Sequence, residues 1–198
     1  MIRVLVFDLG GVLSLPPDLY SEPAALLGVD PAAYEAVYNN GRADYDLGTP
    51  SEEYFGGILA NLAITPSAAL FAHLGNLDTS LWCRLRPTAR ALLDEVSGWD
   101  QRLAILSNAP ITLRACAERT DWYPLLERLF VSAELRLAKP DHRIYHHATA
   151  ELGVAPDEIA FIDDRPENVA GATDVGWNAH LWVDDADSLA WLRQVCGR

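Results

Sequence analysis

Cysteine, positive charge and lysine are all scarce in this sequence of 198 residues. The three cysteines are an odd number without a C-x-x-C or other ligand spacing, so neither a disulfide framework nor a zinc site is indicated, and a reducing, cytoplasmic environment fits best. Fifteen basic residues face 28 acidic ones, which gives a net charge of −13. Because a negative field of this size repels nucleic acid and anionic lipid head groups, we expect neither as a partner.

Long hydrophobic runs are absent as well. Only four apolar residues lie between Arg3 and Asp8, too few for the core of a signal peptide. The segment 54–77 carries no formal charge, but glycines and polar residues interrupt it, which predicts two helices broken at Thr65-Pro66 and not a membrane span. We therefore expect neither export nor insertion in a membrane.

Short apolar runs that alternate with helical patterns are what the sequence does contain. Helical spacing of apolar residues follows Pro87 and Pro140 and recurs near the end of the chain. Alternation of this kind predicts a parallel α/β sheet. The runs that predict buried strands are rich in β-branched and aromatic residues and lie at Arg3–Leu9, Arg102–Leu106, Leu129–Ser132, Ile159–Ile162 and Ala179–Val183.

A long insertion separates the first predicted strand from the helix that leads to the second. It contains no convincing strand, and glycine, proline and aspartate join its helical stretches, which lie near Pro31–Asn40, Ser51–Leu62 and Pro66–Leu74. The pattern predicts an α-helical cap domain at 15–85 inserted into an α/β core domain made of 1–14 and 86–198. Hinges are expected near Ser14–Asp18 and Arg84–Pro87.

Polar side chains stand where the predicted strands end. Asp8 follows the first strand, Ser107-Asn108 the second and Asp163-Asp164 the fourth, while Lys139 precedes the Pro140 helix. Active groups of a parallel sheet gather at the carboxyl ends of its strands. Facing carboxylates repel unless they are protonated or bridged, and hard oxygen ligands suit Mg²⁺. A carboxylate there can also attack phosphorus, so phosphoryl transfer is the predicted reaction class.

Lysine usage supports this interpretation. Lys139 is the only lysine in a chain whose other basic residues are all arginines. An ammonium group is a compact point charge that fits beside a carboxylate and a phosphate in a tight site, whereas the arginine fork needs more room. The position of Lys139 among the strand ends therefore favours a site that binds an anion.

Four segments resemble, in order and spacing, the motifs of the haloacid dehalogenase superfamily. They are F-D-L-G-G-V-L at 7–13, L-S-N at 106–108, K-P-D at 139–141 and F-I-D-D-R-P-E-N-V at 161–169. The resemblance covers 1–14 and roughly 86–198, and it places the insertion where the family has its helical cap. It implies a doubly wound, three-layer α/β core, a Mg²⁺ cofactor and a first-motif aspartate that is phosphorylated and then hydrolysed.

The resemblance also implies roles for individual residues. Asp8 matches the nucleophile and a metal ligand, Asp164 matches the acidic metal ligand, and the Gly10 carbonyl falls where the family coordinates Mg²⁺ through its backbone. The remaining motif residues would support the metal or bind phosphate: Asp163 and Asn168 around the metal, Ser107 and Asn108 at the transferring phosphoryl group, and Lys139 at the aspartyl phosphate.

The sequence departs from the phosphatases of this family at Gly10. They usually have D-x-D in the first motif, and the second aspartate protonates the leaving oxygen and then activates water. Because general acid-base catalysis contributes about 10² to 10⁴ in rate, glycine predicts slow hydrolysis, a tolerant leaving group or a replacement acid. Candidates for the replacement lie in the predicted cap, at Asp18, Glu22, Asp44, Asp46 and His73.

A cap segment before Gly48 is expected to form a loop over the site. It contains Arg42, Tyr45 and Asp46. Arg42 either holds a second anionic group of the substrate or is a surface charge.

The predicted protein is a cytoplasmic, Mg²⁺-dependent phosphatase of a small phosphorylated metabolite, monomeric or homodimeric. Some D-x-G members with a D-D-x-x-x-N fourth motif resemble glucose-1-phosphate phosphatase, which makes a sugar phosphate a natural substrate. One alternative is an L-2-haloacid dehalogenase, although such enzymes resemble S-S-N where this chain has Asp163-Asp164. The other is a phosphate-binding regulatory protein that has lost turnover with the second acid, which Gly10 supports.

Overall fold

The computed structural model describes residues 1–198 and contains one five-stranded sheet. Its order is β3-β2-β1-β4-β5, and every neighbouring pair is parallel. The central strand β1 therefore has β2 on one side and β4 on the other, which is where a doubly wound sheet changes direction. The strands are β1 (Val4–Phe7), β2 (Arg102–Ser107), β3 (Arg128–Val131), β4 (Ile159–Asp163) and β5 (Asn178–Leu181).

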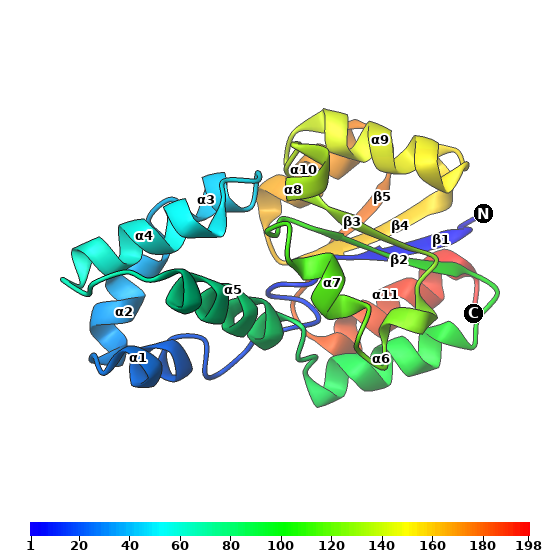
Figure 1. Cartoon of the computed structure of the whole chain (residues 1–198). Coiled ribbons are helices and arrows are strands. Elements are labelled where there is room, and N and C mark those ends of the chain that lie inside the picture. The colour runs from blue at the N-terminus through cyan, green and yellow to red at the C-terminus, as the bar shows by residue number, and fades with distance from the viewer.

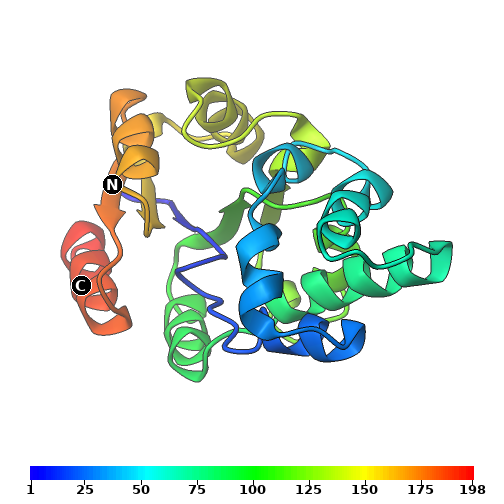
Figure 2. The ribbon, with the colours of Figure 1, turned by 90° about the vertical axis from the view of Figure 1, so that its left-hand side faces the viewer.

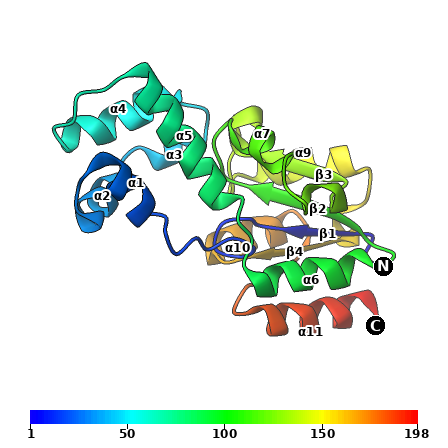
Figure 3. The ribbon, with the colours of Figure 1, turned by 60° about the horizontal axis from the view of Figure 1, so that its bottom comes forward.

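Helices cover both faces of this sheet, and the predicted three-layer α/β fold is confirmed (Figures 1 and 3). One face carries α6 (Pro87–Ser97) and α11 (Asp185–Cys196), and the other carries α9 (His142–Leu152) and α10 (Pro166–Asp174). The shorter elements of the core are α7 (Leu113–Ala117), α8 (Ser132–Leu135) and the 3₁₀ turns Tyr123–Leu125 and Pro156–Glu158.

Local sequence explains where the core helices begin and end. Proline occupies the first turn of α6 and α10, where its missing N–H costs nothing. The Asp141 side chain caps α9 by accepting from the backbone N–H of Arg143, and Gly153 ends that helix in the left-handed conformation. Each face of the sheet has its own hydrophobic cluster, so the strands are buried on both sides.

Five helices form a second body beyond the carboxyl edge of the sheet, which we call the cap (Figures 1 and 2). They are α1 (Ser21–Leu27), α2 (Pro31–Tyr38), α3 (Arg42–Tyr45), α4 (Ser51–Asn61) and α5 (Ala68–Trp82). A third hydrophobic cluster holds them together, and its centre is aromatic, with Tyr45 stacked on Tyr54 at 4.3 Å between ring centroids. The domain boundaries at 14/15 and 85/86 stay a prediction.

Helix limits in the cap differ from those predicted. The chain breaks between α4 and α5 around Thr65-Pro66, as expected, but α5 continues past Leu74 to Trp82. It passes through Gly75, which faces α4: a Cβ there would make an ordinary van der Waals contact with Ser51 Oγ, at 3.4 Å. Two helical segments, α1 and α3, were not expected. No helix of the structure combines the length and the apolar character that crossing a bilayer requires.

Candidate active site

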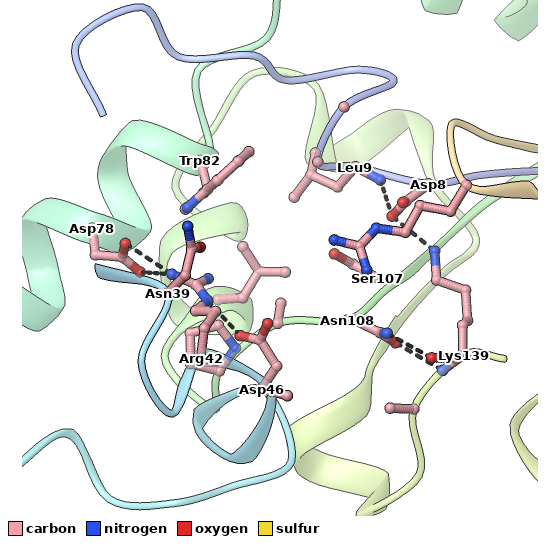
Figure 4. Close-up of a pocket in the computed structure, with 18 of the residues that line it drawn as sticks. Asp8, Leu9, Asn39, Arg42, Asp46, Asp78, Trp82, Ser107, Asn108 and Lys139 are labelled. Carbon is pink, nitrogen blue, oxygen red and sulfur yellow. Dashed lines mark hydrogen bonds and ion pairs between the residues drawn. The ribbon is translucent and has the colours of Figure 1, made fainter. Parts of the chain in front are cut away.

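The polar residues at the strand ends line one pocket with a volume of about 770 Å³ (Figure 4). Asp8 directly follows β1, Ser107 ends β2, and Asp164 directly follows β4. The opposite wall comes from the cap, including Arg42, Asp78 and Trp82. The fold therefore brings together the core residues that the sequence singled out, and it adds a cap wall above them.

Asp8 and Lys139 form the floor of this pocket, and the fully buried Asp163 lies behind them. Lys139 Nζ lies 2.9 Å from Asp8 Oδ1 and 2.6 Å from Asp163 Oδ2, and the lysine side chain is fully buried. Burial raises the pKa of Asp8 to about 7 although Lys139 opposes the shift. Burial also lowers the pKa of Lys139, but the charges of Asp8 and Asp163 outweigh it and leave this pKa raised. The lysine therefore stays charged between the two acids.

Asp163 has both carboxylate oxygens engaged. Its Oδ2 accepts from Lys139, and its Oδ1 accepts from the Asn168 side chain and the Arg165 backbone N–H, both at 2.9 Å. Its side chain is fully buried. This carboxylate orients Lys139 and the start of α10, and it has no free oxygen for a metal.

The donor set fits a hard divalent cation held by the other two acids. Carboxylate oxygens of Asp8, Asp163 and Asp164 lie within 4.8 Å of one another, and of these three residues Asp8 and Asp164 have an oxygen that is not already engaged. Asp8 Oδ1 accepts from the Leu9 N–H and Lys139, which leaves Oδ2 free, and the side chain of the half-buried Asp164 makes no hydrogen bond to another residue. Two free carboxylate oxygens side by side suit Mg²⁺, and Gly10 lines the same pocket.

Gly11 is a residue that sequence reasoning missed. It has φ +83°, and a Cβ there would lie only 2.5 Å from Cγ of Asp164. Glycine thus allows the carboxylate to lie against the backbone that follows β1. The doubled glycine after the first strand is the signal that pointed to this position.

The two polar residues after β2 differ in what their side chains do. The Ser107 hydroxyl makes no hydrogen bond within the chain and lines the pocket, although only 3% of the residue is exposed. The Asn108 amide exchanges two hydrogen bonds of 2.9 Å with the backbone of Lys139. Asn108 therefore fixes the Lys139 loop to β2, while Ser107 remains available to a ligand.

The space above Gly10 belongs to the cap. A Cβ at Gly10 would lie 3.3 Å from Cζ3 of Trp82, the last residue of α5. The indole ring therefore occupies the volume into which a side chain at position 10 would extend. Nothing in the sequence connects these two residues, because Gly10 precedes the insertion and Trp82 lies near its end.

Only one of the five candidate acids of the cap lines the pocket. Asp18, Asp44 and His73 are exposed, and Glu22 forms an ion pair with Arg84. Asp46 does line the pocket, with 14% of its side chain exposed. Burial raises the pKa of Asp46 to about 6 even though Arg42 opposes the shift.

Arg42 lies inside the cap and not on its surface. Its Nε donates to Asp46 Oδ1 at 3.0 Å, and its Nη1 lies 3.1 Å from Asp78 Oδ1. Tyr38 donates to the same Asp78 oxygen at 2.7 Å and accepts from the Trp82 indole N–H at 3.0 Å. Arg42 also donates to the Tyr38 hydroxyl, and because its two charged partners are carboxylates, its charge is already balanced. The segment around it is the helical turn α3 where a loop was expected.

Comparison with known proteins agrees with this geometry. A family model described as haloacid dehalogenase-like hydrolase matches residues 2–176. The chain belongs to this family of hydrolases, and the predicted superfamily is confirmed.

Individual relatives include both phosphatases and dehalogenases. The sesquiterpene phosphatase astK of Aspergillus oryzae is 31% identical over 57% of this chain and 59% of its own length. A crystal structure of a dehalogenase superposes with a TM-score of 0.77 at 20% identity, covering 96% of both chains. A family enzyme from Bacteroides thetaiotaomicron, in complex with magnesium and inorganic phosphate, has a TM-score of 0.70 at 22% identity, covering 91% of this chain and 94% of its own. The chain spans 40 to 59% of the length of the first curated relatives that it matches.

Proposed function

We propose that this hydrolase is a Mg²⁺-dependent phosphatase that acts on a small phosphorylated metabolite, such as a sugar phosphate, through an aspartyl phosphate on Asp8. One observation carries the proposal. Asp8 has a free carboxylate oxygen at the end of the pocket, beside a second free carboxylate on Asp164 and a fully buried lysine. A cation between the two acids relieves their repulsion, and the lysine attracts an anionic substrate.

The chemistry follows from what each group can do. A carboxylate oxygen of Asp8 attacks phosphorus, the new O–P bond forms, and the bond to the leaving oxygen breaks. Water then attacks the aspartyl phosphate, which frees inorganic phosphate and restores the carboxylate. Mg²⁺ held by Asp8, Asp164 and the Gly10 carbonyl would neutralise charge on the phosphoryl oxygens.

The neighbouring residues position and stabilise the phosphoryl group. The Lys139 ammonium lies 2.9 Å from Asp8, where it would stabilise negative charge on a phosphoryl group joined to that residue. The free Ser107 hydroxyl donates to a phosphoryl oxygen. Asn108 keeps the Lys139 loop in place. Asp163 accepts from the Lys139 ammonium group, and Asn168 donates to Asp163, so these two residues support the site from the side of the metal.

The dehalogenase alternative differs from this proposal in what it requires of Asp164, and the regulatory alternative differs in turnover. A dehalogenase uses the nucleophile on carbon without a metal, so it has no use for a second free carboxylate beside Asp8. The names of the relatives include phosphatases and a dehalogenase, and the second acid favours the phosphatase. A regulatory protein would bind phosphate through the same groups but would not release product.

Phosphate release tests the proposal directly. The substrates are p-nitrophenyl phosphate, glucose-1-phosphate and ethyl phosphate, each with Mg²⁺ or EDTA. We expect phosphate release that depends on Mg²⁺ and that is abolished in Asp8→Asn. The control variant Asp18→Asn changes an exposed aspartate of the cap and should release phosphate as the wild type does. No release from any ester contradicts the proposal. Chloride release from 2-chloropropionate without Mg²⁺ would then support the dehalogenase alternative. Binding of vanadate without turnover would support the regulatory alternative.

A further inference from the structure

The proposed phosphatase has glycine where the usual acid would stand, and a cap side chain lies over that position. The Trp82 ring lies above Gly10, at 3.3 Å from a Cβ built on that glycine. A proton for the leaving oxygen must therefore come from another wall of the pocket. The leaving group points away from Asp8, and the wall opposite Asp8 is the cap (Figure 4).

Two cap carboxyl groups line the pocket, and only one has a free oxygen. Asp78 is 2% exposed, and both of its oxygens accept from Arg42, one of them also from Tyr38. Asp46 accepts from Arg42 through Oδ1 alone, and its Oδ2 makes no hydrogen bond within the chain. Asp46 is therefore the cap residue that can carry a transferable proton into the pocket.

Asp46 is also tied to the core beside the candidate phosphate site. Its backbone carbonyl accepts from the Ser132 hydroxyl at 2.5 Å, and Ser132 Oγ accepts in turn from the backbone N–H of Ala109 at 2.9 Å. Ala109 directly follows Asn108 at the end of β2. Figure 4 shows Asp46 on the side of the cap cluster that faces Ser107 and Asn108. The cap thus holds this carboxyl group at a fixed place relative to the core.

We propose that Asp46 is the general acid and base of the reaction, in place of the acid that Gly10 lacks; this rests on the proposed phosphatase function. The protonated Asp46 gives its proton to the leaving oxygen as the bond from that oxygen to phosphorus breaks and the bond from Asp8 forms. The resulting Asp46 carboxylate then takes a proton from the water that attacks the aspartyl phosphate, which returns both residues to their starting state.

The surroundings of Asp46 suit both halves of this cycle. Burial and the charge of Asp78 raise the pKa of Asp46, and Arg42 and Arg165 oppose them; the net result is a pKa of about 6. A carboxyl group with a pKa near the working pH is available in both protonation states. Arg42 stabilises the carboxylate that remains after proton transfer.

The test compares leaving groups in Asp46→Asn and in a matched control, Asp44→Asn, which removes an exposed carboxylate from the same helical turn. Ethyl phosphate needs protonation of its leaving oxygen, and p-nitrophenyl phosphate does not. We expect kcat/KM of Asp46→Asn to fall about 10² to 10⁴-fold with ethyl phosphate and by less than about 10-fold with p-nitrophenyl phosphate. Asp44→Asn should change neither. An equal loss with both esters, or no loss, overturns the proposal.

The pH profile gives a second readout that a merely positioning residue would not move. With ethyl phosphate, kcat/KM of the wild type should pass through a maximum, because Asp8 must be ionised and Asp46 protonated, and Asp46→Asn should lack the decline on the alkaline side while Asp46→Glu retains it. A wild-type profile without the decline overturns the proposal even if the variants do not fold. Absence of phosphate release by the wild type from every ester would instead overturn the proposed function itself.

Discussion

Alanine at Gly11 should abolish metal binding at a small cost in stability. The added Cβ would lie 2.5 Å from Cγ of Asp164, so the carboxylate has to move away from Asp8. Gly28 provides the matched control, because its φ of +69° resembles the +83° of Gly11 but a Cβ there meets nothing within 4 Å. Gly28→Ala therefore introduces similar backbone strain without displacing a side chain.

The expected sizes follow from the strain and from the linkage between binding and stability. A non-glycine residue in the left-handed region costs about 1–2 kcal/mol, which lowers Tm by about 2–8 °C in a chain of this length. Mg²⁺ at a hundred times its Kd stabilises the folded state by about 2.7 kcal/mol, which raises Tm by about 5–10 °C. We expect both variants to lose stability and only Gly11→Ala to lose the rise with Mg²⁺.

Thermal unfolding with Mg²⁺ and with EDTA measures both quantities, and phosphate release is followed in parallel. The wild type and Gly28→Ala should show the Mg²⁺-dependent rise in Tm, and Gly11→Ala should show neither the rise nor turnover. A Gly11→Ala protein that keeps the full rise refutes a metal site between Asp8 and Asp164. Loss of the rise in Gly28→Ala would show that the effect comes from strain alone.

Three further predictions concern stability. Lys139→Met leaves two buried carboxylates without their partner, which should cost about 3–5 kcal/mol and lower Tm in thermal unfolding by about 6–20 °C. Gly171→Ala places a Cβ 2.8 Å from the Pro140 carbonyl oxygen and should lower the free energy of unfolding, measured with urea, by about 1–3 kcal/mol. Gly57→Ala lies in the exposed middle of α4, where a Cβ meets nothing within 4 Å, and should raise that free energy by about 0.5–1 kcal/mol. The folded state raises the pKa of Asp46 from 3.8 to about 6 and therefore favours its protonated form. As the pH rises from 4 to 7, the free energy of unfolding of the wild type should fall by about 2–3 kcal/mol relative to Asp46→Asn. A difference between the two proteins that does not change with pH in urea unfolding contradicts this.

The core could be predicted from the sequence because its signals are local. Each strand is a short apolar run, and the polar residue that ends it, such as Asp8 or Ser107, stands within the same few residues. Parallel topology then brings these ends together without any knowledge of side-chain contacts. Strand limits moved by at most two residues, since ends of elements depend on hydrogen bonds that a hydrophobic pattern does not report.

The cap wall of the site could not be predicted, because its contacts join residues that are far apart in the chain. Asp78 meets Arg42 from 36 positions away, and Trp82 reaches Gly10 across the whole insertion. No periodicity or spacing encodes such pairs. The choice of Asp46 among five candidate acids likewise depended on which side chain the tertiary structure turns toward the pocket.

The single lysine can report on how often the pocket floor becomes accessible to solvent. Apart from the N-terminus, the chain carries one amine, on Lys139, and that side chain is fully enclosed between Asp8 and Asp163. An amine-reactive reagent can therefore label a side chain only when the pocket floor becomes accessible. The labelling rate at Lys139, read by mass spectrometry, gives the frequency with which the pocket floor opens, and a bound phosphate analogue should slow it.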